Sequence, residues 1–447
     1  MGQERLLDMD VVEAEGSKER PPTLPNQARL NEPVRDQLEW VPRTLDSMLD
    51  NEHRARAIWS VVQRLDLKAL YGPIKAVEGH AGHPATDPQV LLALWLYACT
   101  EGVGSARHLA RLCEEHDAYR WLRGGVPINY HMLSDFRVGH KEALDGLLTE
   151  VVASMMAEGL VTLKQVAQDG MRTRASAGSS SFHREKTLEK CLDEARAEVE
   201  RLALEREHPD PGVTKREQAA RERAARERQE RVEAALRRLP EMQAAKERQK
   251  KNKGIAEREK ITEARVSTTD VEATVMKVPD GGFRPGYNAE FATDVGSQVI
   301  VGVGVVTKGS DGGEAPPMVE QIEGRTGRRP EAYLMDWSFV SRDDITTLEL
   351  KGITVYAPTR APQTIGRTQG EARSNDTTEV AAWRRRMETE EAKEIYKERA
   401  ATAECVNAHA RRYGLRQFLV RGLGRVLSVL TLVALAHNVL RWVALTN

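Results

Sequence analysis

The sequence predicts an α/β protein whose mixed sheet is interrupted by an inserted helical hairpin and preceded by an all-helical domain. Apolar side chains recur at helical spacing through residues 41–160. Strand-like character follows at 161–177, in a valine-rich hairpin at 290–309 and at 352–358. Between the first two lies a highly charged stretch, 183–265, with heptad spacing of its own. The 447 residues suffice for two or three domains of this kind.

Composition and charge narrow the range of functions. The net charge is −1, so no global electric field attracts the chain to nucleic acid, and any such attraction must be local. The segment from Cys405 onward contains no Asp or Glu and can provide that attraction. Its arginines are Arg411, Arg412, Arg416, Arg421, Arg425 and Arg441.

The cysteines and the apolar segments indicate in which cellular compartment the protein is expected. The 4 cysteines are far apart and never form a Cys-x-x-Cys motif, which indicates neither a disulfide framework nor a zinc site and favours the cytoplasm. The N-terminal residues contain no apolar signal region. The apolar run 426–440 is too short to span a bilayer and contains His437 and Asn438. It predicts a buried helix and no membrane association.

The first 160 residues divide into a lead-in and a helical domain. Residues 1–40 are polar and contain several prolines, which predicts a loosely ordered segment. Within 41–160, Asp87 precedes a proline and an apolar helix. Ser105 and Asn129 stand where N-caps are expected for two further helices.

The helices between Ser105 and His140 predict a helix-turn-helix-like DNA-binding domain, with 129–140 as the recognition helix. Five side chains of this helix offer groups that could reach base edges or phosphates. They are Asn129, Tyr130, His131, Ser134 and Arg137. The alternative is a packing or dimerising domain, since the net charge of the segment is close to zero.

Residues 161–182 and 266–412 are expected to form the sheet domain. One strand ends at Asp169, a hairpin turns near Gly296, and a later strand ends at Asp336. A long helix then covers 381–412, and the C-terminal helices of 413–447 pack on the domain. This order of elements, with a late helical Glu, is that of the ribonuclease-H-like fold. In that fold the first and fourth strands are neighbours, so the two aspartates can meet.

The charged stretch 183–265 is expected to be an insertion in the sheet domain. Spacings of four and three residues form a heptad seam on its first half, which consists of Leu188, Leu192, Ala195, Val199 and Leu202. Residues 207–213 force a turn, and Val232, Leu236 and Leu239 resume the spacing. A coiled-coil-like helical hairpin is predicted, and a solvated low-complexity linker is the alternative.

Three acidic residues can be placed on one metal-binding frame: Asp169, Asp336 and Glu404. Each alone has an ordinary explanation, as a turn residue before glycine, a strand-end cap and a solvated helical residue. Together they can hold two divalent cations, an arrangement that cuts and rejoins phosphodiester bonds. Asp294, which also ends a strand, is the rival carboxylate.

The helix that carries Glu404 has a further pattern. Tyr396, Arg399, Glu404 and Arg411 lie on it, and Arg411 is almost two full turns after Glu404, so the two share a face. This block resembles bacterial insertion-sequence transposases of the DDE type, whose signature is Tyr, two residues, Arg, three residues, Glu, six residues, and Lys or Arg. Four residues separate Arg399 from Glu404 here, which rotates Arg399 by about 100° relative to the signature.

The resemblance covers roughly residues 40–447. The similar segments are 83–122, 129–137, 167–177, 286–294, 334–339, 416–423 and 436–438. It implies that Asp169, Asp336 and Glu404 are catalytic and bind two Mg²⁺ (or Mn²⁺) ions. It also implies that Tyr396, Arg399 and Arg411 contact DNA, since a guanidinium binds phosphate bidentately.

Two arginines follow the first acid at alternate positions. Arg172 and Arg174 are expected to point to one face of the strand and to contact phosphate near the cleaved bond, with a solvated strand edge as the alternative.

The resemblance implies a DNA transposase of the bacterial cytoplasm, associated with the nucleoid. Its partners would be double-stranded DNA, both the terminal inverted repeats of an element and the target, and a second copy of the chain when DNA is bound. The reactions would be metal-dependent cleavage and strand transfer. Two alternatives stay open: a catalytically decayed DNA-binding relic, and a ribonuclease-H-like nuclease without strand transfer.

Overall fold

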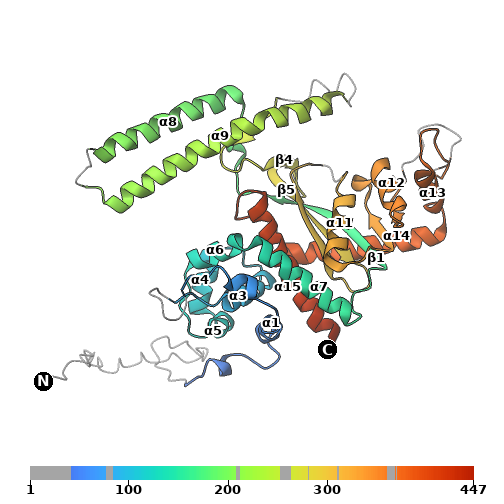
Figure 1. Cartoon of the computed structure of the whole chain (residues 1–447), viewed down its shortest axis with the longest axis horizontal. Helices are drawn as coiled ribbons and strands as arrows, with labels where there is room; N and C mark the ends of the chain where they lie inside the picture. The colour runs from blue at the N-terminus through green and yellow to red at the C-terminus, as the bar shows by residue number, and fades with distance from the viewer. Residues whose placement is uncertain are drawn as a thin grey trace, which may run out of the picture. The chain divides into compact units, whose positions relative to one another are not determined.

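The computed structural model describes residues 42–446 except 77–83, 208–211, 252–262, 280, 310–311, 360–367 and 369 (Figure 1). The predicted N-terminal segment 1–40 and most of the predicted turn at 207–213 therefore lie outside the described residues.

The N-terminal part of the described chain is helical. Three of its helices begin at the predicted caps: the Asp87 side chain accepts from Gln89 N, Ser105 from His108 N, and Asn129 from Met132 N. Each cap satisfies a backbone N–H that the first helical turn leaves without a partner. The elements are η1 (Asp46–Met48), α1 (Arg54–Val62), α2 (Lys68–Tyr71), α3 (Pro88–Thr100), α4 (Ala106–Glu115), α5 (Asp117–Arg123), α6 (Tyr130–Gly139) and α7 (Lys141–Ala157).

A mixed sheet of six strands follows. Its strands are β1 (Gln165–Arg174), β4 (Thr274–Lys277), β5 (Phe283–Asp294), β6 (Ile300–Val306), β7 (Ala332–Met335) and β8 (Thr354–Tyr356). The order across the sheet is β6-β5-β1-β7-β8, with β4 pairing the first residues of β5. Strand β5 is antiparallel to β1 and β6, whereas β7 is parallel to both β1 and β8. The predicted valine-rich hairpin is β5 with β6.

The register between β1 and β7 decides where the two predicted aspartates lie. Gln168 of β1 pairs with Met335 of β7, and the next residues along the two parallel strands are Asp169 and Asp336. The two aspartates are 167 positions apart in the chain, yet parallel pairing brings them to the same level of the sheet.

Helices cover both faces of the sheet. On one face, Ala167, Ala332 and Leu334 pack with Ile395 of α14 (Glu390–Arg412). On the other face, Val166 and Tyr333 belong to the main core with α11 (Ala315–Thr326) and α12 (Arg342–Leu350). Because side chains alternate along a strand, Asp169 shares the face of Ala167 and lies beneath α14.

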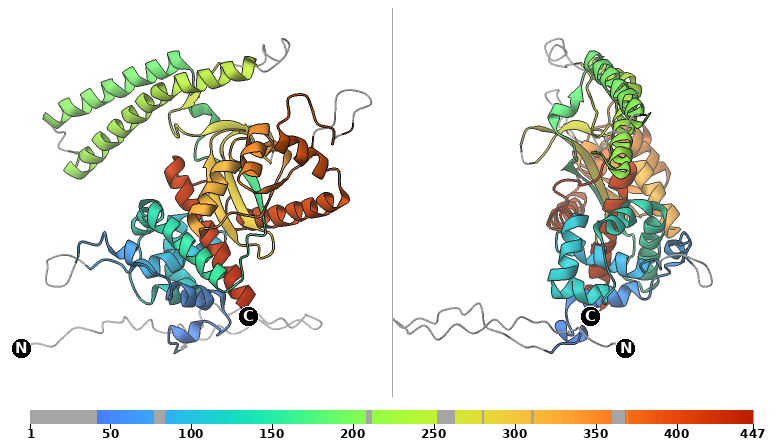
Figure 2. Two further views of the ribbon diagram at one scale, coloured as in Figure 1. Left: turned by 45° about the vertical axis from the view of Figure 1, so that its right-hand side comes forward. Right: turned by 90° about the vertical axis from the view of Figure 1, so that its left-hand side faces the viewer.

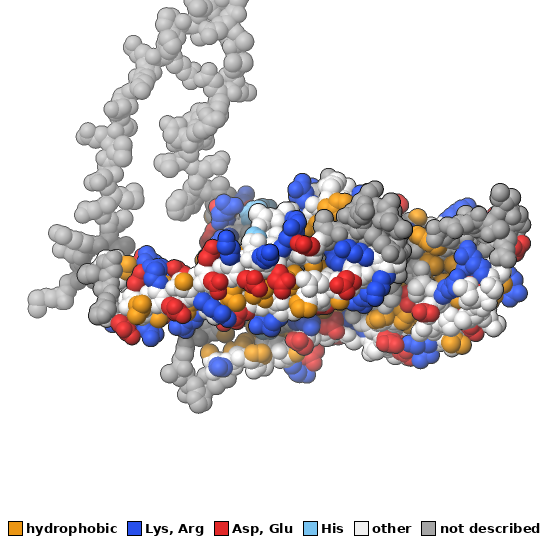
Figure 3. Space-filling model, turned by 90° about the horizontal axis from the view of Figure 1, so that it is seen from above, with side chains coloured by type: hydrophobic (Ala, Val, Ile, Leu, Met, Phe, Trp, Pro, Cys, Tyr) orange, Lys and Arg blue, Asp and Glu red, His pale blue; other side chains and the backbone are white. Residues whose placement is uncertain are grey.

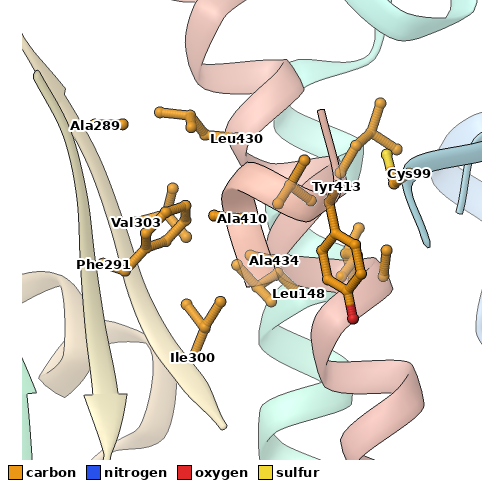
Figure 4. Packing of buried hydrophobic residues seen from close by; sticks show 14 of the residues in the cluster. Cys99, Leu148, Ala289, Phe291, Ile300, Val303, Ala410, Tyr413, Leu430 and Ala434 are labelled. Atoms are coloured by element: carbon orange, nitrogen blue, oxygen red, sulfur yellow. The ribbon is translucent and has the colours of Figure 1, made fainter. Parts of the chain in front are cut away.

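The last helix, α15 (Leu423–Thr446), connects the sheet to the helical part. Figure 4 shows its Leu430 and Ala434 between Phe291 and Ile300 of the sheet and Leu148 of α7. Among the described helices, α15 is the one whose length and composition match a membrane span, and 67% of its apolar window is buried. Burial on this scale accounts for its apolar sequence.

Two polar residues of α15 bind the end of the β5–β6 turn. The Asn438 side chain accepts from Ile300 N at 2.8 Å and donates to Ile300 O at 2.8 Å. His437 Nε2 lies 2.8 Å from the carbonyl oxygen of Gln298. The buried helix with two satisfied polar side chains agrees with the sequence prediction.

The charged insertion forms two helices, α8 (Glu185–Glu207) and α9 (Lys215–Lys251), which run side by side in opposite directions (Figures 1 and 2). The buried residues of α8 are Leu188, Ala195 and Leu202, seven residues apart. Figure 3 shows acidic and basic side chains interleaved along the exposed surface of the pair. At its base, β2 (Phe182–His183) pairs with β3 (Val266–Ser267).

Candidate active site

Asp169 and Asp336 meet at a single cation, the guanidinium of Arg399 on α14. Arg399 Nη2 lies 2.8 Å from Asp169 Oδ1 and 3.6 Å from Asp336 Oδ2. The two carboxyl oxygens are therefore no farther apart than the sum of these distances. The side chains are partly accessible, with 15% of Arg399, 21% of Asp169 and 36% of Asp336 exposed. Parallel pairing of β1 and β7 thus places two carboxylates where one cation can bind both.

Asn407 also binds Asp169, and sequence reasoning missed it. Its Nδ2 donates to Asp169 Oδ2 at 2.7 Å, so α14 provides a donor to each oxygen of this carboxylate. Asn407 is eight residues after Arg399, which is about 80° around a helix. The signal in the sequence was its place on the face that buries Ala403 and Val406.

The sequence forms helix α14 because its buried residues recur at helical spacing, and this helix carries the two donors Arg399 and Asn407. The Thr389 side chain accepts from Ala392 N at 3.2 Å, and Glu390 and Glu391 occupy the first turn, where negative charge is favourable. Its buried residues are Ala392, Thr402, Ala403, Val406, Asn407 and Ala410. This stripe faces the sheet and fixes the rotation of Arg399.

Tyr396 lies at the same place, one turn before Arg399. Burial raises the pKa of its hydroxyl, the positive charge of Arg399 lowers it, and the carboxylates of Asp336 and Asp169 raise it further. The pKa of Tyr396 is thus affected by Arg399, Asp336 and Asp169, the three charged groups of the candidate site. Two residues of the transposase-like signature, Tyr396 and Arg399, therefore reach the site despite the departure in spacing.

Asp336 also begins a short helical turn. Its Oδ1 accepts from Ser338 N and caps η3 (Trp337–Phe339), while Oδ2 faces Arg399. The cap holds the carboxyl group in place, since one oxygen is engaged with the backbone that follows.

Glu404, the third predicted acid, is exposed on α14. It precedes Asn407 by three residues, which is about 60° around the helix, so it lies beside the face that binds Asp169. Among the described residues, no group of three or more His, Cys, Asp or Glu is placed to hold a metal ion. Two of the three predicted acids are together, and the third is on the adjoining helical surface.

Asp294, the rival carboxylate, has a structural role. It is 1% exposed, and its oxygens accept from Leu163 N at 2.9 Å, Ser297 N at 3.0 Å and Ser297 Oγ at 2.7 Å. It pairs with Val166, three residues before Asp169 on β1. These bonds hold the turn between β5 and β6.

The predicted DNA-contacting arginines of the sheet domain differ in accessibility. Arg411 is exposed at the end of α14. Arg172 donates to Lys277 O at 3.3 Å and Gly309 O at 3.0 Å, and Arg174 is exposed. Alternation along β1 places Arg172 and Arg174 on the face opposite Asp169.

The predicted recognition helix, α6, has both exposed and buried candidates. Asn129 and His131 are exposed, and Ser134 is half-buried. Tyr130 is half-buried, with the guanidinium of Arg107 4.9 Å from its ring centre. Arg137 is only 6% exposed. Its guanidinium lies 4.7 Å from the centre of the Trp95 ring and donates to Gly104 O, so it faces the helical core.

Comparison with known families finds two matches, one in the helical region and one over the C-terminal part of the chain. A family described as a transposase domain (DUF772) matches residues 43–139, which include α1 to α6. A family described as a transposase DDE domain matches residues 359–443, which include α14 with Tyr396, Arg399 and Asn407. No curated protein and no solved structure matches the chain. The two family matches, in this order along the chain, support an insertion-sequence transposase of the DDE type.

Proposed function

We propose that this chain binds the ends of an insertion element and catalyses metal-dependent DNA cleavage and strand transfer through Asp169, Asp336 and Glu404. The observation that carries the proposal is the convergence of Asp169 and Asp336 on one cation. Asp336 directly follows β7, as predicted, whereas β1 does not end at Asp169 but continues through it to Arg174. The strand order β6-β5-β1-β7-β8, with β5 antiparallel and β7 parallel to β1, supports a ribonuclease-H-like core.

The donor set suits a divalent cation. DDE transposases generally use such ions, and carboxylate oxygens are the ligands that Mg²⁺ and Mn²⁺ prefer. The guanidinium of Arg399 marks the position of positive charge between the two carboxylates. Asp169 would contribute to both metal positions, and Asp336 and Glu404 would each complete one. When bound, the ions lower the pKa of the attacking water or 3′-hydroxyl and stabilise the leaving oxygen.

The remaining residues hold and orient the reacting groups. Asn407 fixes the direction of the Asp169 carboxylate through its 2.7 Å hydrogen bond. Exposed Arg411, on the same helix as Glu404, would bind the phosphate backbone. Glu404 is exposed on α14 in this structure, so it would complete the triad only after its side chain moves toward the two aspartates. The protein need not provide a nucleophile.

DNA recognition is assigned to the exposed side of α4 and α6. Asn129, His131 and Ser134 would approach bases, and Arg107 would bind phosphate. Arg137 is left out because its cation faces the helical core. We further propose that residues 41–160 form the DNA-binding domain, and that the α8–α9 pair helps two copies of the chain hold two element ends.

One observation favours a second candidate, a decayed transposase that binds DNA without cutting. Glu404 is exposed, and the described residues contain no assembled three-acid cluster. Incubating the protein with a labelled duplex that carries the inverted repeats flanking the gene, in Mg²⁺ or in Ca²⁺, separates the candidates. We expect cleaved and joined products in Mg²⁺ that Asp169→Asn abolishes. Cleavage without joining would indicate a nuclease, and a band shift alone the DNA-binding relic.

A further inference from the structure

We propose that Arg399 is an internal counter-ion that occupies the metal position until DNA binds, so that metal and DNA bind this chain cooperatively. The inference rests on the proposed function. It concerns the metal-free chain, in which one guanidinium nitrogen contacts Asp169 at 2.8 Å and Asp336 at 3.6 Å.

The charges explain why Arg399 lies there. Two carboxylates close together repel each other in a partly buried site, and a cation between them stabilises both charged forms. A divalent ion does the same with twice the charge. It cannot share the position with a guanidinium, because the two cations would repel each other at contact distance. Metal entry therefore requires Arg399 to leave.

The hydrogen bonds of Arg399 are incomplete in its present position. Its Nη2 is engaged by the carboxylates, whereas its Nε is buried without a hydrogen-bond partner among the described residues. A guanidinium has five N–H donors arranged to fit a phosphate or carboxylate side-on. A DNA phosphate at the edge of the site offers a further anionic partner. One phosphate can accept two parallel N–H bonds from the guanidinium, whereas the two aspartates share a single nitrogen, Nη2.

Asn407 keeps the Asp169 carboxylate in place while a metal ion replaces the Arg399 guanidinium. It binds the other oxygen of Asp169 at 2.7 Å and is neutral, so it can remain when a metal ion arrives. When Arg399 leaves, Asp169 Oδ1 and Asp336 Oδ2 both face the position that its guanidinium occupied. Asn407 still holds the Asp169 carboxylate through Oδ2. The carboxylates then need little reorganisation to bind the ion.

Coupling follows from these contacts. DNA that draws Arg399 to a phosphate opens the metal position, and a metal ion that displaces Arg399 makes its guanidinium available to DNA. By thermodynamic linkage, each ligand must raise the affinity of the other by the same factor. The chain would bind metal weakly until DNA is in place.

Calorimetric titration of the DNA-free protein with MnCl₂ tests this. We expect Arg399→Met and Arg399→Gln to bind Mn²⁺ at least about tenfold more tightly than the wild type, because removing a competing cation from the metal position favours the ion. Lys397→Met is the matched control: Lys397 is an exposed cation on α14 that pairs with Glu394 at 2.5 Å. It should leave the Mn²⁺ affinity unchanged. Adding Asp169→Asn to Arg399→Met should remove the gain.

The same Mn²⁺ titration is then repeated in the presence of the duplex that carries the inverted repeats. Saturating DNA should tighten Mn²⁺ binding by the wild type and add little in Arg399→Gln. Mn²⁺ binding that depends on Asp169 but is no tighter in either Arg399 variant overturns the inference and leaves the proposed function standing. Mn²⁺ binding indifferent to both Asp169→Asn and Asp336→Asn overturns both. If neither Arg399 variant folds, an Mn²⁺ affinity of the wild type that DNA does not change overturns the inference.

Discussion

Gly102 and Gly414 pack backbone against backbone, joining the loop after α3 to the end of α14. A Cβ added at Gly102 would lie 2.8 Å from Arg412 O, and one at Gly414 would lie 3.0 Å from Gly102 O. Both residues have positive φ, 71° and 91°. The helix that binds the aspartates is thus held at its far end by the helical region.

The first prediction concerns this contact. Gly102→Ala should lower the free energy of unfolding by about 1–2 kcal/mol for the positive φ, and by a further ~1–3 kcal/mol because the methyl group overpacks the Arg412 carbonyl. Gly124→Ala is the control, since Gly124 has a φ of 57° but nothing within 4 Å of its added Cβ. Urea unfolding measures both. Equal losses in the two variants would refute the close contact.

The second prediction concerns Asn407. Asn407→Ala should lower metal affinity and cleavage rate by about 10–100-fold, the range seen when a residue that orients a metal ligand is removed. The physical reason is the lost hydrogen bond to Asp169 Oδ2. Cys405→Ala, at an exposed position of the same helix, should leave both unchanged. Normal metal binding by Asn407→Ala would show that α14 does not orient Asp169.

The third prediction concerns Asn438. Asn438→Ala removes both partners of the Ile300 backbone, leaving a buried N–H and a buried C=O at the start of β6. Each such group costs about 1–3 kcal/mol, so we expect a lower urea midpoint. Ser428→Ala on the same helix should cost far less, because Ser428 Oγ bonds only to Gly424 O of its own helix. If Asn438→Ala lowers the free energy of unfolding no more than Ser428→Ala does, the two hydrogen bonds of Asn438 to Ile300 do not stabilise the fold as argued.

The fourth prediction is a pH dependence of stability. Burial lowers the pKa of His437 from 6.5 to about 4. In the unfolded chain His437 is protonated below about pH 6.5, whereas in the folded chain it is protonated only below about pH 4. The unfolded state therefore binds more protons between these two values, and the free energy of unfolding falls as the pH falls through this range. The loss contributed by His437 is on the order of 3 kcal/mol.

His437→Gln retains a hydrogen-bond donor for Gln298 O without titrating. Its free energy of unfolding should fall less steeply than that of the wild type between pH 6.5 and 4. Parallel curves for the two proteins would show that His437 does not carry the dependence.

The fifth prediction compares two arginines. Arg411→Ala should weaken DNA binding similarly for all sequences and reduce the slope of log Kd against log salt by about one, as expected for one lost phosphate contact. Arg137→Met should leave this slope unchanged and lower stability, because Arg137 lies over Trp95 inside the helical region. A reduced slope for Arg137→Met would contradict its burial.

Local signals in the sequence predicted part of this structure well. Asp87, Ser105 and Asn129 were identified as caps because capping depends on a few adjacent residues. The meeting of Asp169 and Asp336 followed from the order of strands. Neither inference needed the positions of other side chains.

Features that depend on tertiary packing were harder to predict. The burial of Arg137 is decided by Trp95, on another helix. A helical wheel also could not anticipate that the long Arg399 side chain reaches both aspartates, or that Glu404 faces solvent. The partnership of Asn407 with Asp169 joins residues 238 positions apart, and the place of Asn407 on the buried face of α14 does not reveal which residue it binds.

The pairing of β2 with β3 has an evolutionary consequence. Phe182 pairs with Ser267, and the hydroxyl groups of Ser181 and Ser267 lie 2.7 Å apart, so the chain leaves and re-enters the sheet domain through one small clasp. Everything beyond the clasp can lengthen, shorten or be exchanged without shifting the register of β1 against β5. Related genes are therefore expected to differ most in size here, while the distance from the clasp back to Asp169 stays constant.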